Sequence, residues 1–212
     1  MKIFIAGGTG RVAEHVEKLL QEKGHTVYAG SRHPEKLAQT EALIPVKLDL
    51  HASKDELKKL IEGMDAVYFL AGSRGKDLLQ TDLFGSVKLQ QAAEEAGIKR
   101  FIQLSSMFAL EPDRWAAEEG IDTIPDFNIA KMFADEWLIN NTDLDYTIVQ
   151  PGLLEVKEPT GLIEINPAHE GGNPIPDVAA VLADVLEMPN TEKKVIMFKS
   201  GETPIVKALE TV

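Results

Sequence analysis

The sequence predicts an α/β protein built on a doubly wound parallel sheet with a small C-terminal lobe. Short apolar runs rich in strand-forming residues alternate along the chain with segments in which apolar residues recur every three or four positions. These runs are continuous rather than alternating, which is typical of strands covered by helices on both faces. In addition, a glycine-rich turn joins the first run directly to the first helical segment.

The elements follow in a regular order, with about seven strands. Strands are expected at residues 3–6, 26–30, 46–48, 66–71, 100–104, 146–149 and 194–198. Helices are expected between the glycine turn and Lys23-Gly24, and at residues 34–39, 54–62, 78–96, 129–139 and 178–186. Residues 151–176 are rich in Gly, Pro and acidic residues. We therefore interpret residues 1–212 as one domain in which residues 151–176 form a small substrate-side lobe.

Charge and composition exclude several classes of partner. The 34 acidic residues outnumber the 22 basic ones, so the formal net charge is −12. Such a field repels nucleic acid and anionic membranes, and we expect neither as a partner. The chain has no cysteine, no signal-peptide pattern and no apolar run of membrane-spanning length. We expect a cytoplasmic protein that captures a small molecule in a local site.

The glycine turn is the first candidate binding site. Two overlapping patterns run through it, Gly7-x-x-Gly10-x-x-Ala13 and Gly8-x-Gly10-x-x-Ala13. One glycine permits the tight turn out of the strand, the next lets the backbone approach a pyrophosphate, and a small residue at 13 lets the helix pack closely on the sheet. The helix N-terminus then favours the phosphate charge. This is the dinucleotide-binding pattern of a Rossmann fold; the alternative is a turn with a structural role only.

The end of the second predicted strand distinguishes the two nicotinamide cofactors. NAD sites usually place an acid there for the ribose hydroxyls, whereas an arginine suits the extra phosphate of NADP. This chain has Gly30-Ser31-Arg32-His33 and no acid before Glu35. Arg32 can make paired hydrogen bonds to a phosphate and Ser31 can add another, so NADP(H) is favoured over NAD(H). The alternative is that Arg32 is a solvated loop residue.

Further motifs follow the later strands in a specific order. They are Leu48-Asp49-Leu50, Leu70-Ala71-Gly72, Ala96-Gly97-Ile98-Lys99-Arg100-Phe101, Leu104-Ser105-Ser106, Ala130-Lys131, residues 144–152 ending in Pro151-Gly152, and Asp177-Val178-Ala179. With the glycine turn, they make the chain resemble the short-chain dehydrogenase/reductase superfamily. More narrowly, it resembles the atypical branch that includes nitrogen-metabolite-repressor-like and flavin/biliverdin-reductase-like NAD(P)-binding proteins. The resemblance covers nearly the whole chain.

This resemblance implies a set of site residues. Ser106 would be the catalytic serine, supported by Ser105, and Lys131 the lysine that binds the nicotinamide ribose. The cofactor-binding residues would be Gly7, Gly8, Thr9, Gly10, Arg11, Val12, Ser31, Arg32, Asp49, Leu50, Ala71, Gly72, Ser105, Lys131, Pro151 and Gly152. All of them fall at the C-terminal ends of predicted parallel strands, where open α/β sheets bind ligands.

One residue departs from the superfamily pattern. A tyrosine normally lies four residues before the lysine, where the lysine's charge lowers its pKa for proton transfer. Here that position is Phe127. Three interpretations stay open: hydride transfer with the proton supplied by water, by the substrate or weakly by Ser106; binding of NADP(H) without turnover, as a redox sensor or regulator; or a surface Lys131 paired with Asp135, with Phe127 in the core.

The working prediction is an NAD(P)H-dependent oxidoreductase acting on an unidentified small-molecule acceptor, with the non-catalytic NADP(H)-binding sensor as the alternative. A replacement acid would be sought between Met107 and Asp126, a carboxylate-rich segment that includes Glu118 and Glu119, most of whose acids we expect to be solvated. In the same segment, Phe108 and Trp115 would either wall the substrate site or pack a helix.

No histidine pair has metal-ligand spacing, so no metal site is predicted. The helix at residues 78–96 would either serve a homodimer or cover the sheet in a monomer.

Overall fold

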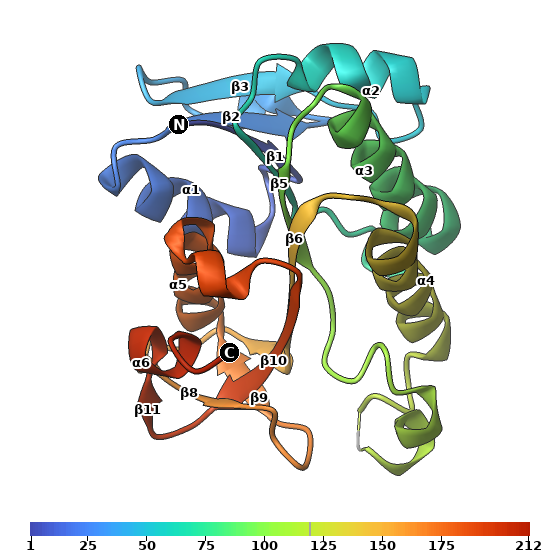
Figure 1. Cartoon of the computed structure of the whole chain (residues 1–212), viewed down its shortest axis with the longest axis vertical. Helices are drawn as coiled ribbons and strands as arrows, with labels where there is room; N and C mark the ends of the chain where they lie inside the picture. The colour runs from blue at the N-terminus through green and yellow to red at the C-terminus, as the bar shows by residue number, and fades with distance from the viewer. Residues whose placement is uncertain (119) are drawn as a thin grey trace.

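The computed structural model describes residues 1–118 and 120–212 (Figure 1). Its strands are β1 (Lys2–Ala6), β2 (Thr26–Ser31), β3 (Leu43–Lys47), β4 (Ala66–Phe69), β5 (Arg100–Leu104), β6 (Asp145–Pro151), β7 (Leu153–Glu155), β8 (Leu162–Ile165), β9 (Gly172–Pro174), β10 (Lys194–Ser200) and β11 (Thr203–Pro204). Within these residues the main sheet holds nine strands in the order β11-β8-β10-β6-β5-β4-β1-β2-β3. The seven from β10 to β3 are parallel, and β8 and β11 form an antiparallel edge. The predicted parallel sheet is confirmed.

Helices cover both faces of this sheet, as Figure 1 shows. They are α1 (Arg11–Glu22), α2 (Lys54–Ile61), α3 (Gly85–Glu95), α4 (Pro125–Asn141), α5 (Ile175–Asp184) and α6 (Ile205–Leu209), with short turns η1 (Pro34–Lys36), η2 (Leu78–Phe84), η3 (Pro112–Ala117), η4 (Val185–Glu187) and η5 (Pro189–Thr191). Side chains alternate along β1, so Ile3 and Ile5 pack in the core with α1 and α5. Phe4 and Ala6 point the other way and pack in the core of α2, α3 and α4.

The strand order reverses direction beside β1. The chain runs from β1 outward to β2 and β3, then returns to place β4, β5 and β6 on the other side of β1. Helices that follow strands on opposite sides of such a point lie on opposite faces, which opens a crevice at the carboxyl ends of the strands. The predicted site residues lie at these ends.

Two predicted elements differ in detail. The helix expected at residues 78–96 begins as η2, which is wound as a wide π-type helix and passes directly into α3. In the segment predicted to form a lobe, β8 pairs with β10 and so widens the main sheet, while β7 and β9 form a separate two-stranded sheet. No helix in the described ranges has both the length and the apolar character that crossing a bilayer requires.

Candidate functional site

A cavity of about 920 Å³ runs along the carboxyl ends of the parallel strands. This volume lies in the usual range for small-molecule and cofactor sites. Sixteen of the predicted site residues line it: Gly7, Thr9, Gly10, Arg11, Val12, Ser31, Arg32, Asp49, Leu50, Ala71, Gly72, Ser105, Ser106, Lys131, Pro151 and Gly152. Gly8 does not line it. The fold thus brings together residues from nearly the whole length between Gly7 and Gly152.

The glycine turn approaches the neighbouring strand too closely for side chains. Gly7 has a φ of +101°, and a Cβ there would lie 2.7 Å from Cα of Ala71. The backbone N–H groups of Gly7 and Gly8 both donate to the carbonyl oxygen of Gly30, at 2.9 and 3.0 Å. These two donors are therefore occupied, and the N–H groups left for an anion are those of the first turn of α1, which have no partner within the helix.

Gly8 has a packing environment of its own. A Cβ at this position would lie 2.8 Å from Cβ of Ala29 and 2.9 Å from Oε1 of Glu17, on the inner side of the turn. The structure therefore places Gly8 against β2 and α1 instead of in the cavity wall. Its contribution is to let the turn lie flat on the sheet.

The end of β2 carries the residues predicted to bind the 2′-phosphate. The hydroxyl of Ser31 is 3.0 Å from that of Thr9 and accepts the backbone N–H of His33 at 3.1 Å, so Ser31 is held in a local network. Arg32 is exposed, lines the cavity, and makes no ion pair with any described carboxylate. Its guanidinium is available to a phosphate, and this planar group can make paired hydrogen bonds to two phosphate oxygens.

Two other cations of this cavity were not predicted from the sequence. Arg74 and Lys76 line it from the segment between β4 and η2, joining Arg11 and Arg32. Their signal in the sequence was the polar run Ser73-Arg74-Gly75-Lys76 directly after the fourth strand. With Lys131, five lysine and arginine residues line one cavity of a chain whose net charge is −12. They outnumber the three acidic residues of the lining, Asp49, Asp82 and Glu170, and this local excess of positive charge favours an anionic ligand.

Lys131 is buried at the far end of the cavity. Its Nζ donates to the carbonyl oxygen of Leu104 at 3.0 Å and lies 5.6 Å from the ring of Phe127 and 6.0 Å from that of Phe69. Burial lowers its pKa, and the charges of Asp82 and Asp135 act in the opposite direction. The interpretation of Lys131 as a surface residue paired with Asp135 is wrong: the lysine is 5% exposed, and the structure shows no ion pair between the two described side chains.

Asp135 instead anchors the end of β5. Its carboxylate accepts the side chains of Gln103 at 2.6 Å, Ser105 at 2.6 Å and Gln150 at 3.0 Å, all within the core. Burial raises the pKa of Asp135 to about 6 against the effect of these hydrogen bonds. The hydroxyl of Ser105 is therefore bonded within the core. The half-buried Ser106 lines the cavity, and its hydroxyl bonds to no described residue.

Phe127 lines the same end of the cavity from the first turn of α4. It offers an apolar ring where the superfamily pattern has a phenol, and it has no proton to transfer. Met107, Ile121, Ile124, Leu153 and Leu154 extend this apolar wall. Pro151 and Gly152 also line this end. The backbone of Gly152 lies so close to that of Gly171 that a Cβ on Gly152 would be 1.8 Å from the carbonyl oxygen of Gly171. This end of the cavity is therefore largely apolar.

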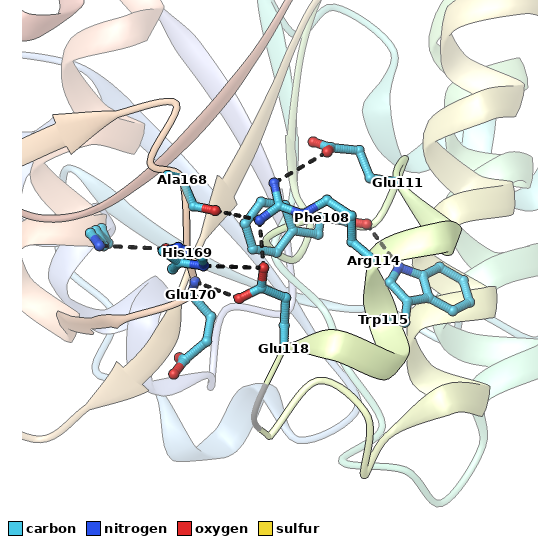
Figure 2. A network of polar contacts seen from close by, with 9 residues as sticks. Phe108, Glu111, Arg114, Trp115, Glu118, Ala168, His169 and Glu170 are labelled. Atoms are coloured by element: carbon cyan, nitrogen blue, oxygen red, sulfur yellow. Dashed lines mark hydrogen bonds and ion pairs between the residues drawn. The ribbon is translucent and has the colours of Figure 1, made fainter.

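A network of polar contacts connects the segment at residues 108–118 to residues 168–170, next to the apolar end of the cavity (Figure 2). Arg114 stacks 3.7 Å from the ring of Phe108 and donates to Glu118 and to the carbonyl oxygen of Ala168. The other oxygen of Glu118 accepts the backbone N–H of Glu170 at 3.0 Å. Glu118, expected to be solvated, is 6% exposed because of these contacts.

The same contacts show the roles of Phe108 and Trp115. Phe108 is fully buried, and Trp115 packs against its cluster and donates to its carbonyl oxygen at 2.8 Å, so both serve packing and neither lines the cavity. Glu119 lies outside the described residues. Among the described residues, no group of three or more histidine and acidic side chains is arranged to hold a metal.

Comparison with known proteins assigns the family. Residues 7–189 match a family model described as NAD(P)H-binding. The "uncharacterized sugar epimerase YhfK" of Bacillus subtilis is 33% identical, with 99% of each chain covered. The crystal structure of the oxidoreductase ylbE from Lactococcus lactis is 44% identical and has a TM-score of 0.96, with 100% of this chain and 96% of that chain covered.

A more distant structure shares the fold alone. A short-chain dehydrogenase/reductase from Veillonella parvula, solved in complex with NADP, is 15% identical with a TM-score of 0.75, covering 96% of each chain. The family match and the nearer relatives confirm the resemblance inferred from the motifs. The chain belongs to the NAD(P)H-binding family, among the atypical short-chain dehydrogenase/reductase proteins of oxidoreductase and epimerase type.

Proposed function

We propose that this protein is an NADPH-dependent oxidoreductase that transfers a hydride to a small, flat, largely apolar acceptor without the usual catalytic tyrosine. One observation carries the proposal: a single cavity extends from the glycine turn and Arg32 at one end to Ser106, Phe127 and Lys131 at the other. The cavity has the polar groups of a dinucleotide site in the order that a dinucleotide requires.

The residues fit this cofactor in each part. The first turn of α1 and Arg11 face the pyrophosphate region, and Arg32 provides the cation for a 2′-phosphate. Asp49 and Leu50, which also line the cavity, would border the adenine. NADPH supplies a hydride when bound, and the apolar wall with Phe127 excludes water from the region where the acceptor would lie.

The hydroxyl of Ser106 and the ammonium of Lys131 are the hydrogen-bond donors at the acceptor end. They would orient an acceptor oxygen and stabilise charge that develops on it. Because Phe127 has no proton, water, the acceptor itself or Ser106 would supply the proton. This arrangement favours acceptors whose reduction does not depend on a strong general acid, such as flavin-like rings.

Calorimetric titration of cofactor-stripped protein with NADPH and NADH tests the cofactor assignment. Arg32→Ala should weaken NADPH binding about tenfold or more and leave NADH binding within about twofold, because only NADPH has the 2′-phosphate. Lys36→Ala is the matched control, since Lys36 is a cation outside the cavity wall. Equal losses for both cofactors would contradict the NADP assignment, and no binding by the wild-type protein would contradict the function.

The second candidate function is a cofactor sensor without turnover, and Phe127 is the observation that favours it. NADPH oxidation with a panel of flavins and other flat acceptors separates the two functions. Steady oxidation that Ser106→Ala slows supports the enzyme. Tight binding with no oxidation, and a partner recovered from lysate in only one redox state of the cofactor, supports the sensor.

A further inference from the structure

Two buried polar atoms in the cavity wall have no role in the site described above. Asp82, on η2, is fully buried, and its Oδ1 has no hydrogen-bond partner in the described part of the chain. Ser73 lies beside it, and its hydroxyl is also buried without such a partner. Both residues line the cavity. Because an unmet buried polar atom is costly, two of them side by side in a cavity wall indicate that a ligand supplies the missing bonds.

A backbone hydrogen bond fixes the carboxylate of Asp82 in the cavity wall. Its other oxygen, Oδ2, accepts the backbone N–H of Ser73 at 2.9 Å, which joins η2 to the end of β4. Oδ1 lies against the backbone of Gly72, since a Cβ there would be 3.4 Å from this oxygen. The wide winding of η2 is of a kind found often at functional sites. Oδ1 is therefore a fixed hydrogen-bond acceptor.

Lys131 provides the complementary donor. Its ammonium has three N–H bonds, of which one goes to the carbonyl oxygen of Leu104. The charge of Asp82 acts on Lys131, yet the structure records no ion pair between them among the described residues. Asp135 cannot fill the role of Asp82, because both of its oxygens are occupied by donors in the core.

The position along the sheet indicates which part of a dinucleotide meets these groups. β4 lies between β1, whose end carries the glycine turn, and β5, whose end carries Ser105 and Ser106. A ligand that runs from the pyrophosphate site to the acceptor site passes the end of β4 with the sugar between its phosphate and its nicotinamide. That sugar carries two adjacent hydroxyls, each able to donate and accept.

We propose that Asp82, assisted by Ser73, accepts a hydrogen bond from the sugar hydroxyls of the nicotinamide half of the cofactor while Lys131 donates to them from the other side. This inference rests on the proposed function. It makes Asp82 a binding residue that supplies, on the sugar, a polar partner that the apolar ring of Phe127 cannot provide.

Three ligands that differ by one part each test this assignment by calorimetry. 2′-Phospho-ADP has the pyrophosphate but lacks the second sugar, 2′-phospho-ADP-ribose has this sugar without nicotinamide, and NADPH has both. Asp82→Asn should weaken the two larger ligands about tenfold, because a charge-assisted bond becomes a neutral one, and leave the smallest within about twofold. Asp143→Asn, which removes a carboxylate outside the cavity wall, should change none of the three.

Ser73→Ala is the second variant, in case Asp82→Asn folds poorly. It should weaken the two larger ligands about threefold to tenfold and spare the smallest. Unchanged binding of all three ligands by both variants overturns the inference, and so does an equal loss for all three, which would make the pair structural. If the wild-type protein binds 2′-phospho-ADP as tightly as NADPH, the second sugar adds nothing and this inference fails alone. If it binds none of the ligands, the proposed function fails as well.

Discussion

The hydroxyl of Ser105 donates a 2.6 Å hydrogen bond to Oδ2 of Asp135 in the core between β5 and α4. Asp135 lies one helical turn after Lys131, so this bond sets the register between the strand that ends in Ser106 and the helix that carries the lysine. The two adjacent serines thus have different roles. Ser105 fixes the strand against the helix, and Ser106 lines the cavity with its hydroxyl unbonded to any described residue.

Substitution of these two serines should separate stability from ligand binding. Ser105→Ala should lower the free energy of unfolding by about 1–3 kcal/mol, because it leaves a buried carboxylate oxygen with one donor fewer. Ser106→Ala should leave that free energy within about 0.5 kcal/mol and reduce turnover instead. Urea denaturation with parallel activity assays measures both. Similar unfolding curves for the two variants would contradict this division.

The backbone of the glycine turn should tolerate no side chain. Gly7→Ala adds a Cβ 2.7 Å from the backbone of Ala71 at a φ of +101°. We therefore expect the free energy of unfolding to fall by more than about 2 kcal/mol and dinucleotide binding to be lost. Gly63→Ala is the control, because Gly63 has a φ of +77° with no atom within 4 Å of an added Cβ. It should cost about 1 kcal/mol and leave binding unchanged. Equal losses would show that φ alone, and not the close approach, matters at Gly7.

Glu17 should make the protein less stable as the pH rises. Burial, and to a smaller extent the charge of Glu14, raises the pKa of Glu17 to about 8. Since the unfolded chain ionises near the ordinary value of 4.5, the folded state holds the extra proton between these values. Stability from this group is therefore complete below about pH 4.5 and declines as the pH rises to about 8.

Glu17→Gln tests that sign. At about pH 9 the variant should be more stable than the wild type by more than about 1 kcal/mol, and at about pH 4 the two should be nearly equal. Urea denaturation at both pH values measures the difference, with the exposed Glu22→Gln on the same helix as control. A pH-independent difference would show that Glu17 does not titrate in this range.

Restoring the phenol should increase proton-dependent turnover. Phe127→Tyr places a hydroxyl in the cavity wall one turn before Lys131, whose ammonium lies 5.6 Å from the ring. With a carbonyl acceptor we expect kcat to rise about tenfold or more, and NADPH binding to stay within about twofold. Phe133→Tyr on the same helix adds an equivalent phenol at an exposed site and should change neither. An unchanged kcat for Phe127→Tyr would show that proton transfer is not limiting.

Much of the fold was predictable because its signals are local. Continuous apolar strands, helical periodicity and the glycine turn predicted the parallel sheet, and the boundaries of β5 matched the prediction, since each depends on residues close in the chain. The wide winding of η2 was not predictable. Its sequence has ordinary helical periodicity, and the pairing of Asp82 with Ser73 that accompanies it joins residues from two elements.

The site divides in the same way. Residue types at definite places in motifs were enough to predict the dinucleotide-binding turn, the cation at Arg32, the Ser106 and Lys131 positions and the absence of a tyrosine at 127. Packing between distant segments set the rest: Gly8 lies against β2, Ser105 faces the core, Lys131 is buried without an ion pair to the described Asp135, and Asp82 holds an open acceptor. These features depend on which side chains fill the neighbouring space, and elements far apart in the chain supply those side chains.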